Sequence, residues 1–116
     1  MFSGLAGMHE VLNLLAALPA AGPAEHLQVL LARPGLRVER IISDGQVSPP
    51  GFWYEQPEDE WVLVLQGAGS IEYADGRRVA LGSGDSLLIP AHCRHRVAET
   101  APRTVWLAIF CVPESS

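Results

Sequence analysis

From Leu27 onward the chain is a series of short apolar or alternating runs, separated by Gly, Pro and Asp-Gly turn signals. Runs of this length are typical of β-strands, and Asp75-Gly76 between two alternating runs is a strong hairpin signal. We expect strands at residues 27–31, 36–43, 52–56, 60–65, 70–74, 77–81, 86–89, 94–99 and 104–112. This many short strands indicate an all-β fold, either a small antiparallel barrel or a two-sheet sandwich of the jelly-roll type.

The first 24 residues follow a different pattern. Leu12, Leu15 and Ala16 repeat at helical spacing, which predicts a short amphipathic N-terminal helix from His9 to Leu18, ended by Pro19. Residues 19–23 are rich in Ala, Gly and Pro and form a linker. We therefore expect an N-terminal helix and linker over residues 1–24 and one β-barrel domain over residues 25–116.

Length and composition restrict the class of protein. A chain of 116 residues with 48% apolar and 18% charged residues is one compact domain. A net charge of −5 argues against a nucleic-acid surface, which needs clustered positive charge. The apolar run from Val11 is too short to span a membrane. It also lacks the basic residues that precede a secretory signal, so we expect a cytoplasmic protein.

The two cysteines do not form a disulfide framework. Cys111 lies in the last apolar run, where we expect a buried free thiol. Cys93 lies in a turn next to Arg94, and nothing else in its surroundings indicates a stabilised thiolate.

Residues 84–97 contain the clearest functional pattern. Gly84-Asp85 begins a short apolar strand, and Pro90 ends it because proline has no N–H for a sheet. A turn then places His92 and His95 three residues apart. Strand, proline, turn and histidine form a rigid arrangement that can direct an imidazole across a sheet.

These residues resemble the paired motifs of the cupin superfamily. Six residues separate Glu60 from Gly67, and Gly84, Pro90 and His95 match the second motif. The resemblance, which covers roughly residues 51–112 and is nearest to a group of small single-domain bacterial cupins, implies a double-stranded β-helix. In such a barrel the bore holds a divalent metal and a small ligand.

The sequence departs from the family pattern at the metal ligands. The two histidines of the first motif are replaced by Tyr54 and Gln56 or, in the longer spacing that cupins also allow, by Trp53 and Glu55. His92 stands at a position where the family has Gly, and Glu99 replaces a terminal Asn. The resemblance therefore implies a metal held by Glu60 and His95, with Gln56, and with His92 or Glu55 as substitutes. Carboxylate, imidazole and amide ligands can bind Zn, Fe, Mn or Ni as divalent ions.

Strand alternation predicts which of these side chains enter the bore. Glu55 and Gln56 must point to opposite faces, and we expect Gln56 inside. Val62, Val64 and Leu88 are expected to line the bore, whereas Arg94 and Arg96, on the face opposite His95, are expected at its rim.

Two classes of function follow. The first is a cupin that binds a divalent metal and either acts on or senses a small polar metabolite. As an enzyme it would be of oxygenase or isomerase type, with Tyr54 or His92 moving protons. The second is a ligand-binding or dimeric interaction cupin without metal, in which Glu60 is a surface carboxylate, His95 a hydrogen-bonded core residue and His92 a turn residue. For either class the family resemblance and the apolar side of the N-terminal helix imply a homodimer.

Overall fold

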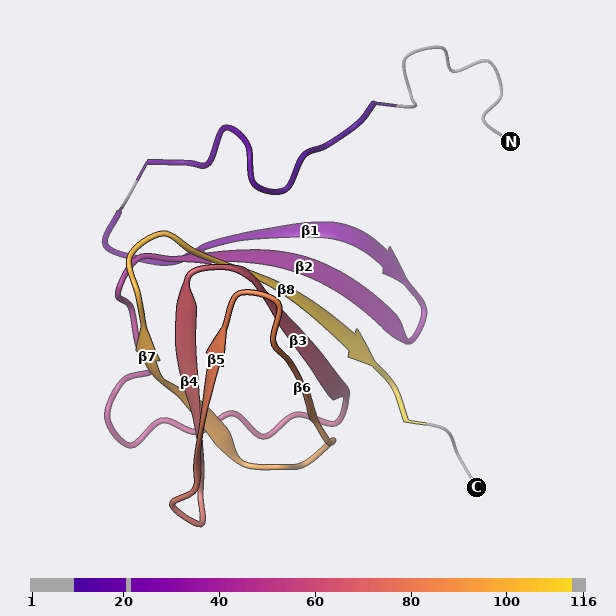
Figure 1. Cartoon of the computed structure of the whole chain (residues 1–116). Helices are drawn as coiled ribbons and strands as arrows, with labels where there is room; N and C mark the ends of the chain where they lie inside the picture. Colours follow the sequence, from indigo (N-terminus) through magenta and orange to yellow (C-terminus); the bar gives the residue numbers. More distant parts are fainter. Residues whose placement is uncertain (1–9, 21, 114–116) are drawn as a thin grey trace.

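The computed structural model describes residues 10–20 and 22–113, which contain two antiparallel β-sheets (Figure 1). The fold is all-β, as expected. Its strands are β1 (His26–Arg33), β2 (Leu36–Ser43), β3 (Asp59–Gln66), β4 (Ala68–Tyr73), β5 (Arg78–Gly82), β6 (Ser86–Ile89), β7 (His95–Thr100) and β8 (Thr104–Cys111). The expected strand at 52–56 is reduced to a single bridge between Tyr54 and His95.

In both sheets, strands that are distant in the sequence are neighbours. The larger sheet has the order β1-β2-β8-β3-β6 and the smaller one β5-β4-β7, so β8 lies between β2 and β3. Alternation along β8 directs Trp106, Ala108 and Phe110 between the sheets, and all three are buried. β8 therefore contributes more residues to the core cluster than any other strand.

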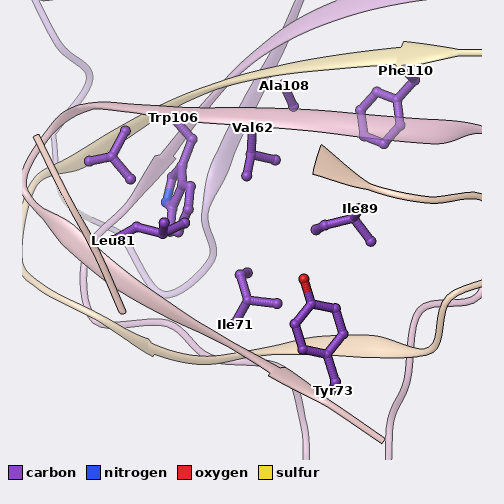
Figure 2. Packing of buried hydrophobic residues seen from close by; sticks show 9 residues of the cluster. Val62, Ile71, Tyr73, Leu81, Ile89, Trp106, Ala108 and Phe110 are labelled. Atoms are coloured by element: carbon purple, nitrogen blue, oxygen red, sulfur yellow. The ribbon is translucent and has the colours of Figure 1, made fainter. Parts of the chain in front are cut away.

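The hydrophobic core lies between the two sheets (Figure 2). Val64 of β3 is fully buried, and Ile71 and Tyr73 of β4 point inward as predicted. The whole cluster comprises Val62, Val64, Ile71, Tyr73, Leu81, Ile89, Trp106, Ala108 and Phe110. At β6, Leu88 is 57% exposed and Ile89 is buried. The expectation that Leu88 lines the bore is therefore wrong, because Ile89 is the residue of this strand that points inward.

The predicted N-terminal helix is not present in the described residues 10–20 (Figure 1). Asn13 Oδ1 accepts a hydrogen bond from the Leu15 N–H at 2.9 Å, and Ala17 has a φ of 51°. A local side-chain bond and a left-handed residue both compete with a helix. The expected first residue of the helix, His9, lies outside the described residues.

Arg40 of β2 and Arg103 of the turn between β7 and β8 donate hydrogen bonds to main-chain carbonyls of this segment. Arg40 Nη1 donates to the Leu14 carbonyl at 3.1 Å, and Arg103 Nη1 donates to the Pro19 carbonyl at 2.6 Å. The segment is therefore tied to the barrel by its backbone rather than by a helical apolar face. No helix within the described ranges has the length and apolarity needed to cross a membrane.

Cys111 is the last residue of β8 and is exposed, so the expected burial of its thiol is wrong. Phe110 next to it points inward, and alternation therefore directs Cys111 outward. Both cysteines are free thiols.

Candidate metal centre and ligand cavity

Two residues from opposite sheets meet inside the barrel. Glu60 is the second residue of β3, and His95 is the first residue of β7. His95 Nε2 lies 3.3 Å from Glu60 Oε1, and Gln56 Nε2 donates a hydrogen bond to the same oxygen at 2.9 Å. The structure thus brings together three of the residues that the sequence singles out.

The ring of His95 is fixed from several sides. Its Nδ1 lies 2.9 Å from the carbonyl of Cys93, and a carbonyl can only accept, so Nδ1 carries the proton. Tyr54 stacks on the ring with centroids 5.5 Å apart, and main-chain hydrogen bonds join the two residues in both directions. The remaining nitrogen, Nε2, therefore faces Glu60 in a side chain that is only 4% exposed.

These surroundings shift the acidity of His95. Burial lowers its pKa, but the hydrogen bond to Glu60, the Cys93 carbonyl and the charge of Glu60 together outweigh burial and raise the pKa. Without a metal, Nε2 therefore holds a proton and forms an ion pair with Glu60 more readily than an ordinary histidine would. The pKa of Tyr54 is also raised, first by burial and then by the charges of Glu25 and Glu60.

The turn that precedes β7 positions Gln56 through the backbone of His92. The His92 N–H donates to the Gln56 carbonyl at 2.7 Å. His92 itself is exposed, has a φ of 64°, and is not among the residues that line the cavity next to His95. The left-handed φ explains why a glycine suits this position in the family motif.

Glu55 and Gln56 point to opposite sides, with Gln56 in the cavity as alternation predicts. Glu55 is exposed and lies 3.8 Å from Arg94. Neither Glu55 nor His92 is brought to the Glu60–His95 pair.

A cavity of about 270 Å³ adjoins this pair. Its wall combines apolar and aromatic side chains with carboxylates and one guanidinium. The lining residues are Glu25, Leu27, Arg37, Glu39, Ile41, Ser43, Tyr54, Gln56, Glu60, Val62, Ile71, Ile89, His95, Val97, Trp106 and Phe110. Val62 lines it as expected, whereas Val64 is buried in the core.

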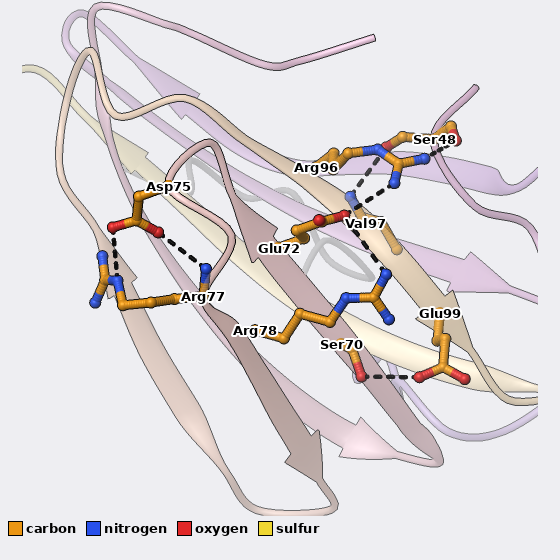
Figure 3. Close-up of polar contacts among 9 residues, drawn as sticks. All are labelled: Ser48, Ser70, Glu72, Asp75, Arg77, Arg78, Arg96, Val97 and Glu99. Atoms are coloured by element: carbon orange, nitrogen blue, oxygen red, sulfur yellow. Dashed lines mark hydrogen bonds and ion pairs between the residues drawn. The ribbon is translucent and has the colours of Figure 1, made fainter. Parts of the chain in front are cut away.

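The two arginines expected at the rim, Arg94 and Arg96, do not line the cavity. Arg96 donates to Glu72 at 3.1 Å and to the Ser48 carbonyl at 2.7 Å (Figure 3). Arg94 is exposed next to Glu55 and Trp53. The arginine that does line the cavity is Arg37 of β2, so the prediction of rim arginines from β7 is wrong.

Sequence reasoning missed the contribution of β2 to the cavity. Alternation places Arg37, Glu39 and Ile41 on one side of this strand, but no motif indicates that this side faces the bore. The only available signal was a pair of opposite charges on the same side of a strand as an aliphatic residue.

The donor set fits a divalent metal. The Nε2 of His95, the Glu60 carboxylate and the Gln56 amide converge, and the Cys93 carbonyl orients the imidazole as metal-bound histidines usually are. Within residues 10–20 and 22–113, no group of three or more His, Cys, Asp or Glu side chains is arranged to hold a metal. The candidate centre has two such residues. In the structure Gln56 turns its N–H group to Glu60, so its amide would have to rotate to offer its oxygen, a ligand that suits hard divalent ions, as the third donor.

Comparisons with known proteins agree with this architecture. A family model described as the cupin domain matches residues 40–110. No curated protein matches the chain. In a crystal structure, a candidate mannose-6-phosphate isomerase from Ralstonia eutropha is 51% identical, covering 90% of this chain and 99% of its own, with a TM-score of 0.85.

Two more distant structures share the fold. A cupin superfamily protein from Desulfitobacterium hafniense is 23% identical over 90% of this chain and 93% of its own, with a TM-score of 0.76. KdgF from a Halomonas species is 22% identical over 83% of this chain and 87% of its own, with a TM-score of 0.67. The chain belongs to the cupin family.

Proposed function

We propose that this cupin binds one divalent metal ion through Gln56, Glu60 and His95 and holds a small polar metabolite in the adjoining cavity. The observation that carries the proposal is the contact between His95 Nε2 and Glu60 Oε1, 3.3 Å apart on the wall of a cavity of about 270 Å³. A half-buried carboxylate and a buried imidazole with neighbouring open space are the parts of a metal site that keeps positions free for a ligand.

The reaction class that we favour is isomerisation, with oxygenation as the other metal-dependent possibility. The similarity to the Ralstonia protein described as a candidate sugar-phosphate isomerase supports the first. A bound metal would act as a Lewis acid toward a ligand oxygen. An isomerase also needs a group that moves a proton, and the wall of the cavity offers Tyr54.

The role of Tyr54 follows from its surroundings. Burial and the charges of Glu25 and Glu60 raise its pKa above the ordinary value of 10.0, so the phenol is protonated at neutral pH. It can therefore donate a hydrogen bond or a proton to a ligand oxygen in the cavity. His92, also expected to move protons, is exposed and does not line this cavity, so we assign that role to Tyr54.

Calorimetric titration of metal-free protein with Zn²⁺, Mn²⁺, Fe²⁺ and Ni²⁺ tests the metal centre. The protein is purified without a polyhistidine tag. We expect one site per chain in the wild type and loss of uptake in Glu60→Gln and His95→Ala. Glu55→Gln, which removes a neighbouring carboxylate outside the cavity, is the matched control and should bind metal like the wild type. Full occupancy in either ligand variant would overturn the proposed ligands.

A ligand-binding cupin without metal is the second candidate. The observation that favours it is the single histidine of the centre, together with the ion pair that His95 and Glu60 form when no metal is present. This candidate predicts that the wild type takes up none of the four metals and still binds a small ligand. The same titration therefore separates the two functions.

A further inference from the structure

A second polar group faces the cavity from β2 and has no part in the metal centre. Glu39 is 6% exposed, and its Oε2 accepts a hydrogen bond from Arg37 Nε at 2.5 Å. Arg37 also reaches Glu58 Oε2 at 3.2 Å, and its guanidinium lies over the Phe110 ring, 4.2 Å from the centroid. Both Arg37 and Glu39 line the cavity.

Strand pairing places this group across the cavity floor from the metal centre. On β8, Phe110 is paired with Arg37 on one side and with Glu60 on the other, and Ala108 is paired with Glu39 and with Val62. The backbones of β2 and β3 are therefore about 10 Å apart, with β8 between them. Glu39 and Val62, on either side of Ala108, both line the cavity. A molecule that contacts Glu60 and His95 can extend over this floor to Glu39.

The charges at this end disfavour an anion. Apart from Glu60 at the metal centre, the cavity wall carries the carboxylates Glu25 and Glu39, and among the residues that the structure describes Arg37 supplies its one guanidinium. Arg37 is in addition engaged by Glu58. A carboxylate or phosphate placed here would meet more negative than positive charge at short range, which weakens its binding in a partly desolvated site.

A hydroxyl group fits the same end well. The Glu39 carboxylate accepts hydrogen bonds and the adjacent Arg37 guanidinium donates them, and a hydroxyl can do both. The Trp106 ring, which also lines the cavity, offers apolar contact to the C–H face of such a ligand.

We propose that Glu39, oriented by Arg37, is a specificity-determining residue that selects a neutral, hydroxylated end of the ligand and rejects a carboxylate or phosphate there. The proposal rests on the proposed function for the position of the other end of the ligand, at Glu60 and His95. It makes a polyol or a sugar without a phosphate the preferred ligand class.

Binding of two matched probes tests the selectivity. Glucitol and glucitol 6-phosphate differ by one phosphate and lack a carbonyl, so neither can be isomerised. We expect the wild type to bind glucitol about tenfold more tightly than its phosphate, followed by nuclear magnetic resonance titration. In Glu39→Gln the ratio should fall to about threefold or less, because one like charge has been removed while the side chain keeps its shape.

Glu99→Gln is the control, since it makes the same change in net charge at an exposed position on β7 outside the cavity. It should keep the wild-type ratio. The proposal is overturned if the phosphate binds the wild type more tightly, if Glu39→Gln leaves the ratio unchanged, or if neither probe binds.

A purely structural role for the Arg37–Glu39 pair makes a different prediction. Glu39→Gln would then lower the melting temperature without changing the ratio of the two affinities, and this result also overturns the proposal. Each titration is run on metal-free and on metal-treated protein. If the protein takes up no metal but still prefers glucitol to its phosphate, the role of Glu39 is supported and the proposed metal centre is not. Failure of the metal centre and failure of the Glu39 proposal are therefore distinguishable.

Discussion

The proton on His95 Nε2 links stability to pH in the metal-free protein. Its folded pKa is raised above the ordinary value of 6.5, so the ion pair with Glu60 is fully present below that value and is lost as pH rises through the raised pKa. We expect the difference in unfolding free energy between wild type and Glu60→Gln to be larger at about pH 6 than at about pH 9. Chemical denaturation at both pH values measures it. A difference that grows with pH would contradict the ion pair.

His92 is a residue whose backbone conformation, rather than its imidazole, fits its position. A non-glycine residue with a φ of 64° is strained by about 1 kcal/mol. His92→Gly should therefore raise the melting temperature by about 4 °C, while metal uptake stays unchanged because the N–H to Gln56 is kept. Thermal unfolding and metal titration of this variant check both expectations. Loss of metal in His92→Gly would mean that the imidazole is a ligand after all.

At the scale of the strands, the motif glycine after β3 is explained by a close approach between segments. A Cβ on Gly67 would lie 2.8 Å from the Cα of Thr104, and the φ of Gly67 is +93°. We expect Gly67→Ala to destabilise the fold by roughly 3 kcal/mol, through backbone strain plus overpacking. Gly76, with a φ of +94° and open space around it, is the matched control.

Gly76→Ala should cost only the backbone term, about 1 kcal/mol. Denaturant unfolding of both variants measures the difference. Equal losses would show that contact with Thr104 contributes nothing.

The strands and the central pair could be predicted because their signals are local. Alternation and turn residues locate the strands of the barrel, and the spacing of Glu60, Gly67 and His95 follows the family motif. The position of Arg37 and Glu39 could not be predicted, because alternation says that they share a side but not which side faces the bore. The prediction of an N-terminal helix was wrong because Arg40 and Arg103, far along the chain, donate hydrogen bonds to backbone carbonyls of that segment.

For the whole molecule, the outer face of the larger sheet argues for a homodimer. Strand pairing aligns Leu31, Val38, Ile109, Trp61 and Leu88 in one row across all of its strands, on the face opposite the cavity. Leu31 is 39% and Leu88 57% exposed. In a two-fold dimer the same surface of each protomer meets its copy, and an apolar row without charges can pack against an identical row.

Light scattering at micromolar concentration should give twice the 12.5 kDa mass of the chain. Ile109→Glu, in the middle of the row, should shift the protein to the monomer. Ala80→Glu, exposed on the smaller sheet, should leave the dimer intact. A monomeric wild type would contradict the prediction.

The metal centre is the claim on which the functional proposal depends, and anomalous diffraction from a crystal of metal-loaded protein tests it most directly. The account predicts one anomalous peak per chain, about 2.0–2.2 Å from His95 Nε2 and from a Glu60 oxygen, with Gln56 as the third protein ligand. A peak bound by His92 or Cys93 instead, or no peak within the barrel of fully loaded protein, would contradict it.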